Sequence, residues 1–300
     1  MRHDRPSDTA RFVLNGIHWV SQHPRLGSEV PRDLARYTDE MVRCVEWGGK
    51  AKVSWIDRRI SRLKAGLMQA VSIPGIYLYQ VMRKRYIESV ARSHVLPNVS
   101  QLIVLGAGFD TLSLRIGSSR VGMTVIEVDH PASRAAKLEA IGRFNFSTGP
   151  CVFVDSDIDR DGIAESLARC PEYDPNAPTL FVAEGLTMYL QESRVRDLFE
   201  FVSGGSSESR ILFTYMEEGP DGSWDFREQG ALATRWLAFK NERFTWGAKR
   251  QAIAGILAQC GLDLVEERTA EDLRSDLLSP ENRDVRIAHG ENTVLARPAG

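Results

Sequence analysis

The sequence predicts an α/β protein built on a doubly wound, mostly parallel sheet. From residue 101 onward short β-rich runs alternate with helical patterns, which is typical of a sheet covered by helices on both faces. The first five runs are almost continuously apolar, as strands buried on both faces are. The last two are more polar and alternate in hydropathy, which favours a place at the sheet edge. The runs are QLIVLG (101–106), TVIEVD (124–129), CVFVDS (151–156), TLFVAEG (179–185), RILFTYM (210–216), LDLVEER (262–268) and NTVLARP (292–298).

Helical patterns fill three of the intervals between these runs. They cover residues 131–141, where Pro131 suits the first helical position, 191–202, and 250–260, which stops at Gly261. A further interval, 217–249, has no strand pattern and is rich in aromatic residues. Insertions of this length commonly cover a site, and this aromatic density argues against disorder. We expect it to form part of a substrate pocket. Its aromatic residues are Trp224, Phe226, Trp236, Phe239, Phe244 and Trp246.

The first 95 residues have a purely helical pattern, punctuated by proline and glycine. The predicted helices cover residues 8–21, 32–46, 51–70 and 76–95. No linker rich in Pro, Gly or Ser separates them from the sheet region. We therefore expect residues 1–95 to form a helical cap packed on a core of residues 96–300, and not an independent module.

Composition excludes several classes of protein. The chain has 300 residues, of which 43% are hydrophobic and 26% charged, as in an average globular enzyme. With 38 Lys and Arg against 40 Asp and Glu, the net charge of −2 gives no basic field for nucleic acid. A small-molecule partner, or a protein docked locally, is expected instead.

No metal centre and no membrane segment is expected. The four cysteines form no CxxC pair and the six histidines do not cluster, so neither a zinc site nor a disulfide framework is predicted. The amino terminus lacks the apolar region of a signal peptide, and the most apolar stretch, residues 66–82, is short and interrupted. We expect a cytoplasmic protein.

A glycine pair, Gly106 and Gly108, follows the first strand directly. Glycines at the carboxyl end of this strand let the backbone turn tightly and approach a ligand, in the crevice where such sheets bind nucleosides. A dinucleotide fingerprint would have a third small residue where Thr111 stands, so a NAD-dependent reductase is disfavoured. A nucleoside without a pyrophosphate fits better; a plain turn is the alternative.

Carboxylates follow the next three strands. Asp129 lies about 20 residues after the glycine loop, where an acidic residue can bind a ribose diol; the alternative is a cap of the helix at Pro131. Asp157, with apolar Ile158 beside it, can receive the amine of adenine, and Asp155 is its rival. Glu184 ends a buried strand, where a carboxylate needs a partner such as an ammonium group.

Three motifs carry a resemblance to a known family: GAGFDTLSLRI (106–116), VIEVDHP (125–131) with Lys137, and FVAEGLTMYL (181–190). In this order and spacing they resemble the leucine carboxyl methyltransferase-like group of class I methyltransferases, which use S-adenosylmethionine (SAM). The group includes protein carboxyl methyltransferases and natural-product O-methyltransferases. The resemblance implies a Rossmann-like, seven-stranded sheet with an antiparallel last strand, and SAM as cofactor.

The resemblance also assigns site residues. It implies an arginine for the SAM carboxylate, a glycine loop along SAM, and carboxylates for the ribose, the adenine and the methionine ammonium. In this sequence these are Arg83, Gly106, Gly108, Asp129, Asp157 with Ile158, and Glu184.

Four neighbouring side chains are assigned no contact with the cofactor. Lys84 and Arg85 follow Arg83 directly, and for them a solvated helix face is nearly as good an interpretation as contact with a ligand. Asp110 is expected to cap the helix after the glycine loop. Arg115, at another family position, is expected to be structural, as an ion-pair partner of Glu127.

A SAM-dependent O-methyltransferase acting on a small molecule with a carboxylate or hydroxyl group is the leading hypothesis. Trp246-Gly247 resembles a motif of the bacterial small-molecule branch, and residues 11–68 do not follow the protein carboxyl enzymes. The alternatives are a protein carboxyl methyltransferase and a non-catalytic nucleoside-binding protein. His130 is expected to line the adenine. No catalytic residue is assigned, which favours a carboxylate acceptor, although Tyr189 and Tyr215 stay open as bases.

Overall fold

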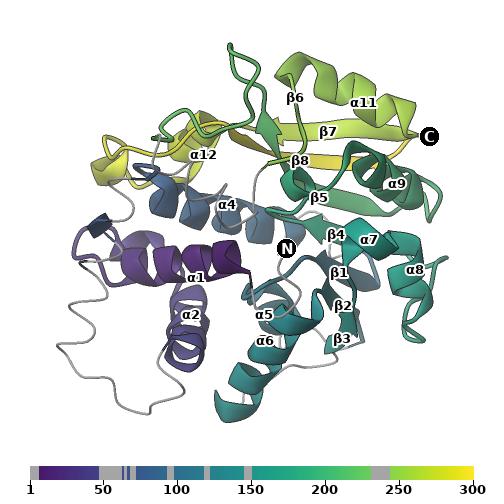
Figure 1. The fold of residues 1–300 in the computed structure, drawn as a ribbon, viewed down its shortest axis with the longest axis horizontal. Coiled ribbons are helices and arrows are strands. Elements are labelled where there is room, and N and C mark those ends of the chain that lie inside the picture. The colour runs from purple at the N-terminus through teal and green to yellow at the C-terminus, as the bar shows by residue number, and fades with distance from the viewer. Residues whose placement is uncertain are drawn as a thin grey trace.

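The computed structural model describes residues 7–46, 63, 66–67, 72–92, 98–117, 122–144, 151–230 and 244–300. One twisted sheet runs through this part of the molecule, with helices on both of its sides (Figure 1). All seven predicted strands form, and their ends lie within two residues of the predicted ones. The predicted α/β class with a doubly wound, mostly parallel sheet is confirmed.

The main path of the sheet has the strand order β3-β2-β1-β4-β5-β8-β7. Neighbours from β3 to β5 are parallel, whereas β8 is antiparallel to both β5 and β7, so the predicted antiparallel last strand is confirmed. The strands are β1 (Gln101–Leu105), β2 (Thr124–Asp129), β3 (Cys151–Asp155), β4 (Thr179–Ala183), β5 (Arg210–Glu217), β7 (Leu262–Arg268) and β8 (Glu291–Pro298).

Two features of the sheet differ from the prediction. Of the two strands expected at an edge, β7 lies there; β8 lies between β5 and β7 and is buried at seven of its eight positions, so the edge assignment of residues 292–298 is wrong. An eighth strand, β6 (Gly247–Ala248), pairs with β5 beside the main path. A strand of only two residues is too short to show a periodicity from which it could be predicted.

The helices follow the predicted patterns closely where the structure describes them. The first begins and ends where predicted, and the second ends one residue earlier. The predicted helix at 51–70 lies mostly outside the described residues. The helices are α1 (Asp8–Ser21), α2 (Arg32–Val45), α4 (Ile76–Val90), α5 (Leu112–Gly117), α6 (Pro131–Phe144), α7 (Ile158–Asp161), α8 (Ile163–Ala168), α9 (Glu192–Ser203), α11 (Ile253–Gln259) and α12 (Ala270–Leu277), with short 3₁₀ turns at Gly27–Glu29, Thr187–Tyr189, Arg250–Ala252 and Pro280–Asn282.

Alternate residues of the central strands supply two separate cores. Leu102 and Val104 of β1 join a core with side chains of α1, α4 and α12. Ile103 and Leu105, pointing to the other face, join a core with α8, α9 and α11. This follows from the two-residue period of a strand, and it explains why the central strands are apolar throughout.

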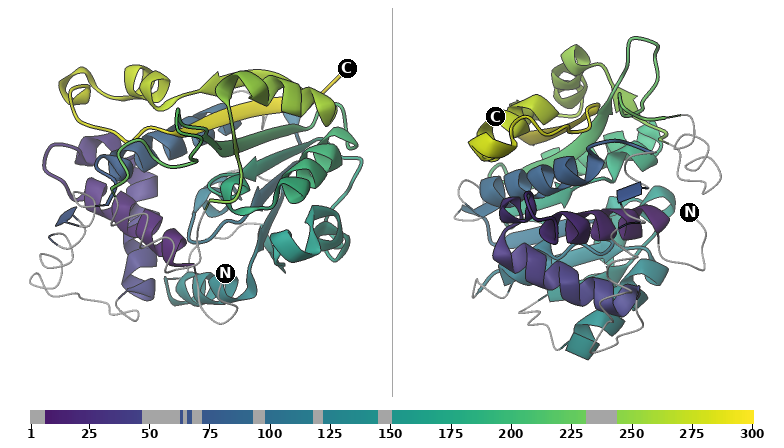
Figure 2. Two further views of the ribbon diagram at one scale, coloured as in Figure 1. Left: turned by 45° about the horizontal axis from the view of Figure 1, so that its top comes forward. Right: turned by 90° about the vertical axis from the view of Figure 1, so that its left-hand side faces the viewer.

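The amino-terminal helices share the first of these cores. α1 lies alongside α4 in both views (Figure 2), and Gly16 allows this approach, since a Cβ atom there would lie 2.4 Å from Cδ1 of Tyr77. Ile17 and Ile76 of these helices are buried together with Leu102 and other sheet residues. The division into a cap (1–95) and a core (96–300) stays a prediction.

Part of the aromatic interval 217–249 is described, and its aromatic side chains take two kinds of position. Trp246 is buried in the second core against Phe199 and Tyr215. Phe226 and Phe244 pack on each other instead, with ring centroids 6.2 Å apart, and both line a cavity. Trp236 and Phe239 lie outside the described residues.

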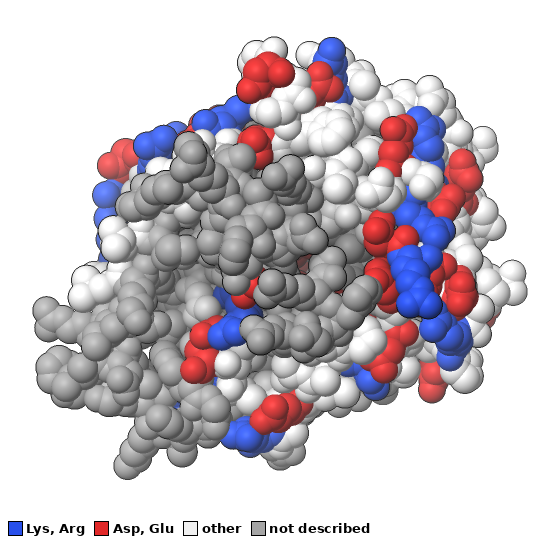
Figure 3. All heavy atoms as spheres, viewed as in Figure 1, with Lys and Arg blue, Asp and Glu red and all other residues white. Residues whose placement is uncertain are grey.

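The surface carries both signs of charge side by side. On the face in Figure 3, Lys and Arg alternate with Asp and Glu over α7 to α9, where Arg169 pairs with Asp161 and Arg194 with Asp197. Of the described helices, none is long and apolar enough to cross a membrane.

Glu127 of β2 and Lys137 of α6 form a buried ion pair that joins the sheet to the helix. Their side chains are 3% and 1% exposed, Nζ lies 2.6 Å from Oε1, and Ser113 also donates to this oxygen. The expected pair of Glu127 with Arg115 is therefore wrong. Arg115 pairs with Glu88 of α4 instead, because its guanidinium points toward α4 and α2, where Glu88 and Asp33 lie.

Removing one partner of this pair should destabilise the fold strongly. Lys137→Met leaves the Glu127 carboxylate buried without a cation, and we expect a loss of about 3–5 kcal/mol in the free energy of unfolding, measured with urea. Arg143→Met on the same helix is the control; its pair with Glu139 is exposed and should contribute about 0–1 kcal/mol. An equal loss in both variants would contradict this account, whereas Glu127→Leu combined with Lys137→Met should recover stability.

Candidate active site

The carboxyl ends of the central strands open into a cavity of about 610 Å³, within the range of small-molecule sites. Its walls come from the strand ends, from α1, α2 and α4, and from Phe226 and Phe244, two aromatic rings of the 217–249 interval that pack edge to face. The structure brings every sequence-predicted site residue to this cavity: Arg83, Gly106, Gly108, Asp129, Asp157, Ile158 and Glu184.

The glycine loop after β1 has a backbone that only glycine adopts readily. Gly106 and Gly108 have φ angles of 62° and 51°. A Cβ atom at Gly106 would lie 2.9 Å from Cδ1 of Leu186, and one at Gly108 would lie 2.9 Å from Cβ of Ala10. Both glycines are thus required by conformation and by space, and the second lets α1 lie directly over the loop.

Asp129, the last residue of β2, faces this loop. The backbone N–H of Gly108 donates to Oδ2 at 2.7 Å, and that of His130 donates to Oδ1 at 2.7 Å. Burial raises the pKa of the Asp129 carboxyl to about 6, although both hydrogen bonds oppose the shift. The carboxylate holds the loop in place and still lines the cavity.

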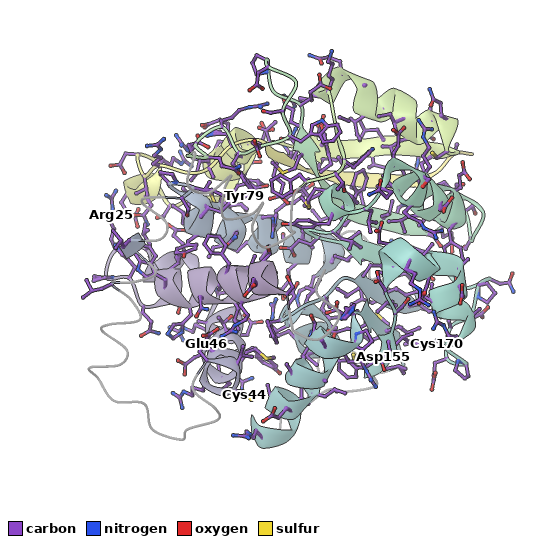
Figure 4. All side chains as sticks on the ribbon, in the orientation of Figure 1. Arg25, Cys44, Glu46, Tyr79, Asp155 and Cys170 are labelled. Carbon is purple, nitrogen blue, oxygen red and sulfur yellow. The ribbon has the colours of Figure 1, made fainter. Side chains whose placement is uncertain are left out.

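Asp155 and Asp157, the two carboxylates considered for the adenine, have different surroundings. Asp157 lines the cavity and precedes α7, yet its side chain makes no capping hydrogen bond to that helix. Ile158, beside it, is buried and also lines the cavity. Asp155 lies at an exposed position on the edge strand, where Arg134 donates to it at 2.7 Å (Figure 4). Of the two carboxylates, Asp157 is placed to meet a ligand in the cavity.

Arg83 of α4 lies between two buried carboxylates. Its Nη1 is 2.6 Å and 2.5 Å from the two oxygens of Glu291, and its Nε is 2.9 Å from Oε1 of Glu184. Burial by itself lowers the pKa of Arg83, but the two carboxylates raise it overall, so the guanidinium stays charged. Tyr79, labelled in Figure 4, donates its hydroxyl to the backbone oxygen of Glu291 and lies beneath the cation.

Lys84 and Asp110 extend this charged cluster. Nζ of Lys84 is 3.1 Å from both Glu184 and Asp110, and the lysine side chain is 6% exposed. The alternative of a solvated helix face is thus wrong for Lys84, whereas Arg85 pairs with Glu29. Asp110 caps α5 as expected, accepting from the backbone of Leu112, and also lines the cavity. Lys84 and Arg115 hold its pKa well below the usual range against the effect of burial.

Glu291 is a site residue that sequence reasoning missed. It is the first residue of β8, lies opposite Met216 of β5, and is 1% exposed. Because β8 is antiparallel, its amino end lies at the same sheet edge as the carboxyl ends of the parallel strands. An acidic residue directly before the predicted antiparallel strand (292–298) was therefore the available signal.

The other end of the cavity is largely apolar. It contains one titratable ring hydroxyl, that of Tyr189, and no cysteine or histidine among the described lining residues that belong to it. Phe12 and Ile17 come from α1, and Phe226 and Phe244 line the cavity from the 217–249 interval. Its apolar and aromatic residues are Phe12, Val13, Ile17, Leu34, Ile73, Ile76, Met188, Tyr189, Phe226 and Phe244, and the polar Thr38, Ser72, Gln80 and Thr245 lie on the same segments. His130 lies at the opposite, carboxylate-bearing end, and Tyr215 donates to Glu267 away from the cavity.

Comparison with known proteins identifies relatives of this chain. A family model described as leucine carboxyl methyltransferase matches residues 43–203. A Mycobacteroides abscessus protein, named "Putative S-adenosyl-L-methionine-dependent methyltransferase", is 26% identical over 285 residues, covering 92% of this chain and 91% of its own. A Mycobacterium tuberculosis protein of the same name is 25% identical over 260 residues, covering 77% and 78%.

Solved structures show the same fold. The crystal structure of a DUF574 family protein from Streptomyces avermitilis superposes with a TM-score of 0.56, at 14% identity and with 98% of both chains covered. At this identity the likeness concerns the fold alone.

Loss of the Glu291 charge should destabilise the protein. Glu291→Gln keeps the shape of the side chain but points an N–H group at the Arg83 guanidinium, so we expect a loss of about 1–3 kcal/mol in the free energy of unfolding without ligand. Urea denaturation measures it. Glu271→Gln is the matched control, since this side chain is 58% exposed and should change stability by about 0.5 kcal/mol or less. Equal stability of both variants would refute the importance of the Arg83 pair.

Proposed function

The chain belongs to the leucine carboxyl methyltransferase family and is a SAM-dependent methyltransferase, and from this premise we propose that it methylates an oxygen atom of a small-molecule acceptor. The observation that carries the proposal is the cavity itself. One end is lined by the glycine loop and the carboxylates, and the other by apolar and aromatic side chains. A cofactor and an apolar acceptor can therefore meet inside one cavity.

The charged end of the cavity suits the parts of SAM. In the proposed arrangement the loop at Gly106 and Gly108 lies along the cofactor, Asp129 binds the ribose hydroxyls, and Asp157 with Ile158 binds the adenine. Among the groups in direct ion-pair contact, the three carboxylates of Asp110, Glu184 and Glu291 outnumber the two cations of Arg83 and Lys84, while Arg115 also acts on Asp110.

That excess of negative charge supports Glu184 as the partner of the SAM ammonium group. Arg83 is proposed for the carboxylate. Because its nitrogens already contact Glu184 and Glu291, its orientation is fixed before any ligand binds.

SAM supplies a methyl group on a positively charged sulfur, which passes in line to the acceptor oxygen while the electron pair of the broken carbon–sulfur bond stays on sulfur. The protein aligns the two reactants and excludes water. α1 contributes to the alignment of the reactants and to the exclusion of water, since Ala10 covers the glycine loop and Phe12 lines the apolar end. We propose residues 1–95 as the lid of the cavity for this reason. A carboxylate acceptor needs no base, whereas a hydroxyl must lose a proton.

The Asp129 carboxylate should make SAM binding depend on pH. A carboxylate accepts from two ribose hydroxyls, but a protonated acid loses one acceptor, so affinity should be constant above pH 6 and fall toward tenfold per pH unit below it. Calorimetric titration with SAM measures this. Asp129→Ala should abolish binding, and Asp155→Ala, outside the cavity, should not. Unchanged affinity in Asp129→Ala would overturn the cofactor assignment.

Deprotonation of Asp129 should lower the stability of the ligand-free protein, although it favours SAM binding. Its pKa in the folded protein, about 6, exceeds the usual 3.8, so folding without ligand favours the protonated form. The contribution of Asp129 to stability is therefore fully present below pH 3.8 and is lost as the pH rises through 6.

A protein carboxyl methyltransferase is the second candidate, favoured by the description of the family model. The two differ in where the methyl group goes. With SAM carrying a labelled methyl group, we expect label in the small-molecule fraction of a bacterial extract and not in its macromolecules. Asp129→Ala is the inactive control. Label that precipitates with protein and is released by mild alkali as methanol would favour the second candidate instead.

A further inference from the structure

Lys84 of α4 lines the cavity but has no part so far in ligand binding. Its side chain is only 6% exposed, and Nζ lies 3.1 Å from Oδ2 of Asp110 and 3.1 Å from Oε1 of Glu184. Both of these carboxylates also line the cavity. An ammonium group taken out of water needs several polar contacts to offset its lost hydration. A buried lysine at a cavity wall is therefore a candidate for contact with an anionic group of a ligand.

The donors of Arg83, by contrast, are nearly all in use. A guanidinium group has five N–H donors. Nη1 contacts both oxygens of Glu291, at 2.6 and 2.5 Å, and Nε and Nη2 each lie 2.9 Å from Oε1 of Glu184. Within the described part of the chain these contacts leave one N–H, on Nη2, for a ligand. Because one N–H cannot hold both oxygens of a carboxylate, the carboxylate of SAM needs a second donor near Arg83.

Lys84 has the donor that Arg83 lacks. An ammonium group has three N–H donors that rotate at the end of a flexible chain, and two carboxylates contact Nζ in the described part of the molecule. A third donor is then left for a ligand. Nζ of Lys84 also approaches the same oxygen of Glu184 as Nε and Nη2 of Arg83. The two cations are thus neighbours at one carboxylate.

The chemistry of SAM brings its carboxylate to this point. The amino-acid end of SAM has an ammonium group and a carboxylate group on one carbon atom, so the two charges stay close together. With the ammonium group at Glu184, the carboxylate lies beside the cations that contact Glu184. Among the described residues these are Arg83 and Lys84. Each charge of the ligand then meets a group of opposite charge.

We propose that Lys84 is a second cofactor-binding cation: together with the remaining N–H of Arg83, it binds the carboxylate of SAM. This inference rests on the proposed function, which places the ammonium group of SAM at Glu184 and its carboxylate at Arg83. The two cations then have different tasks. Arg83 is held by Glu184 and Glu291 and keeps the site in shape. Lys84 recognises the carboxylate, and so selects against S-adenosyl compounds that lack this group.

The experiment compares three ligands by calorimetry with the full chain. They are S-adenosylhomocysteine, its decarboxylated analogue S-adenosyl-3-thiopropylamine, which keeps the amine, and 5′-methylthioadenosine, which lacks both groups. The wild type should bind S-adenosylhomocysteine about 100-fold more tightly than the decarboxylated analogue, and Lys84→Met should reduce this preference to about tenfold. The affinity of Lys84→Met for the other two ligands should fall by no more than about threefold, because neither has a carboxylate.

Two further variants complete the comparison. Arg85→Met, at the next position, is the matched control: Arg85 pairs with Glu29 and is not among the residues that line the cavity, so the preference should stay near about 100-fold. Lys84→Met combined with Asp110→Asn guards against misfolding, since it removes the cation together with an anion that it neutralises. The asparagine oxygen can still cap α5. This double variant should show the same reduced preference as Lys84→Met.

A structural role of Lys84 would weaken all three ligands by the same factor and leave the preference unchanged. That result, or a preference in both Lys84 variants within about twofold of the wild type, would overturn the proposal. Equal affinity of the wild type for S-adenosylhomocysteine and its decarboxylated analogue would instead contradict the placement of the carboxylate at Arg83, and the proposed arrangement of SAM would fail with it.

Discussion

The buried contacts of Arg83 connect parts of the chain that are distant in sequence. The guanidinium belongs to α4, Glu184 follows β4, and Glu291 begins β8, so a single cation ties an amino-terminal helix to two strands of the sheet. Moving three such charges out of water costs several kcal/mol for each ion, and only close, multiple hydrogen bonds offset that cost. The short contacts of Arg83 with both carboxylates satisfy this condition. α4 and the sheet thus meet at a point where the geometry is strictly defined.

A buried ion cluster is weak support for stability, since apolar residues of equal volume would serve as well. Its imbalance is more informative. Lys84 cannot neutralise Asp110 and Glu184 together while Arg83 is shared between Glu184 and Glu291. Among the groups in direct contact the carboxylates thus outnumber the cations, which favours a ligand that brings a cationic group to Glu184.

The fold could be predicted from the sequence because its signals are local. A doubly wound sheet needs apolar strands, and glycine and carboxylate residues at strand ends are visible without any structure. What could not be predicted depends on contacts between distant segments. Glu127 is paired with Lys137 and not with Arg115, because α6 and not α5 presents the cation to β2. Lys84 is buried because α4 brings two cations into the site and not Arg83 alone. Glu291 could be assigned to the site only once the antiparallel direction of β8 was known.

The two halves of the cavity are built in different ways, and this bears on what can change in such a protein. The charged half consists of strand ends and a glycine loop whose positions follow from sheet geometry. The largely apolar half consists of side chains from α1, α4 and the 217–249 interval, which pack on the sheet without being part of it. Substitutions there can reshape acceptor binding without disturbing the strand ends. α4 is the exception, because Arg83 fixes its position.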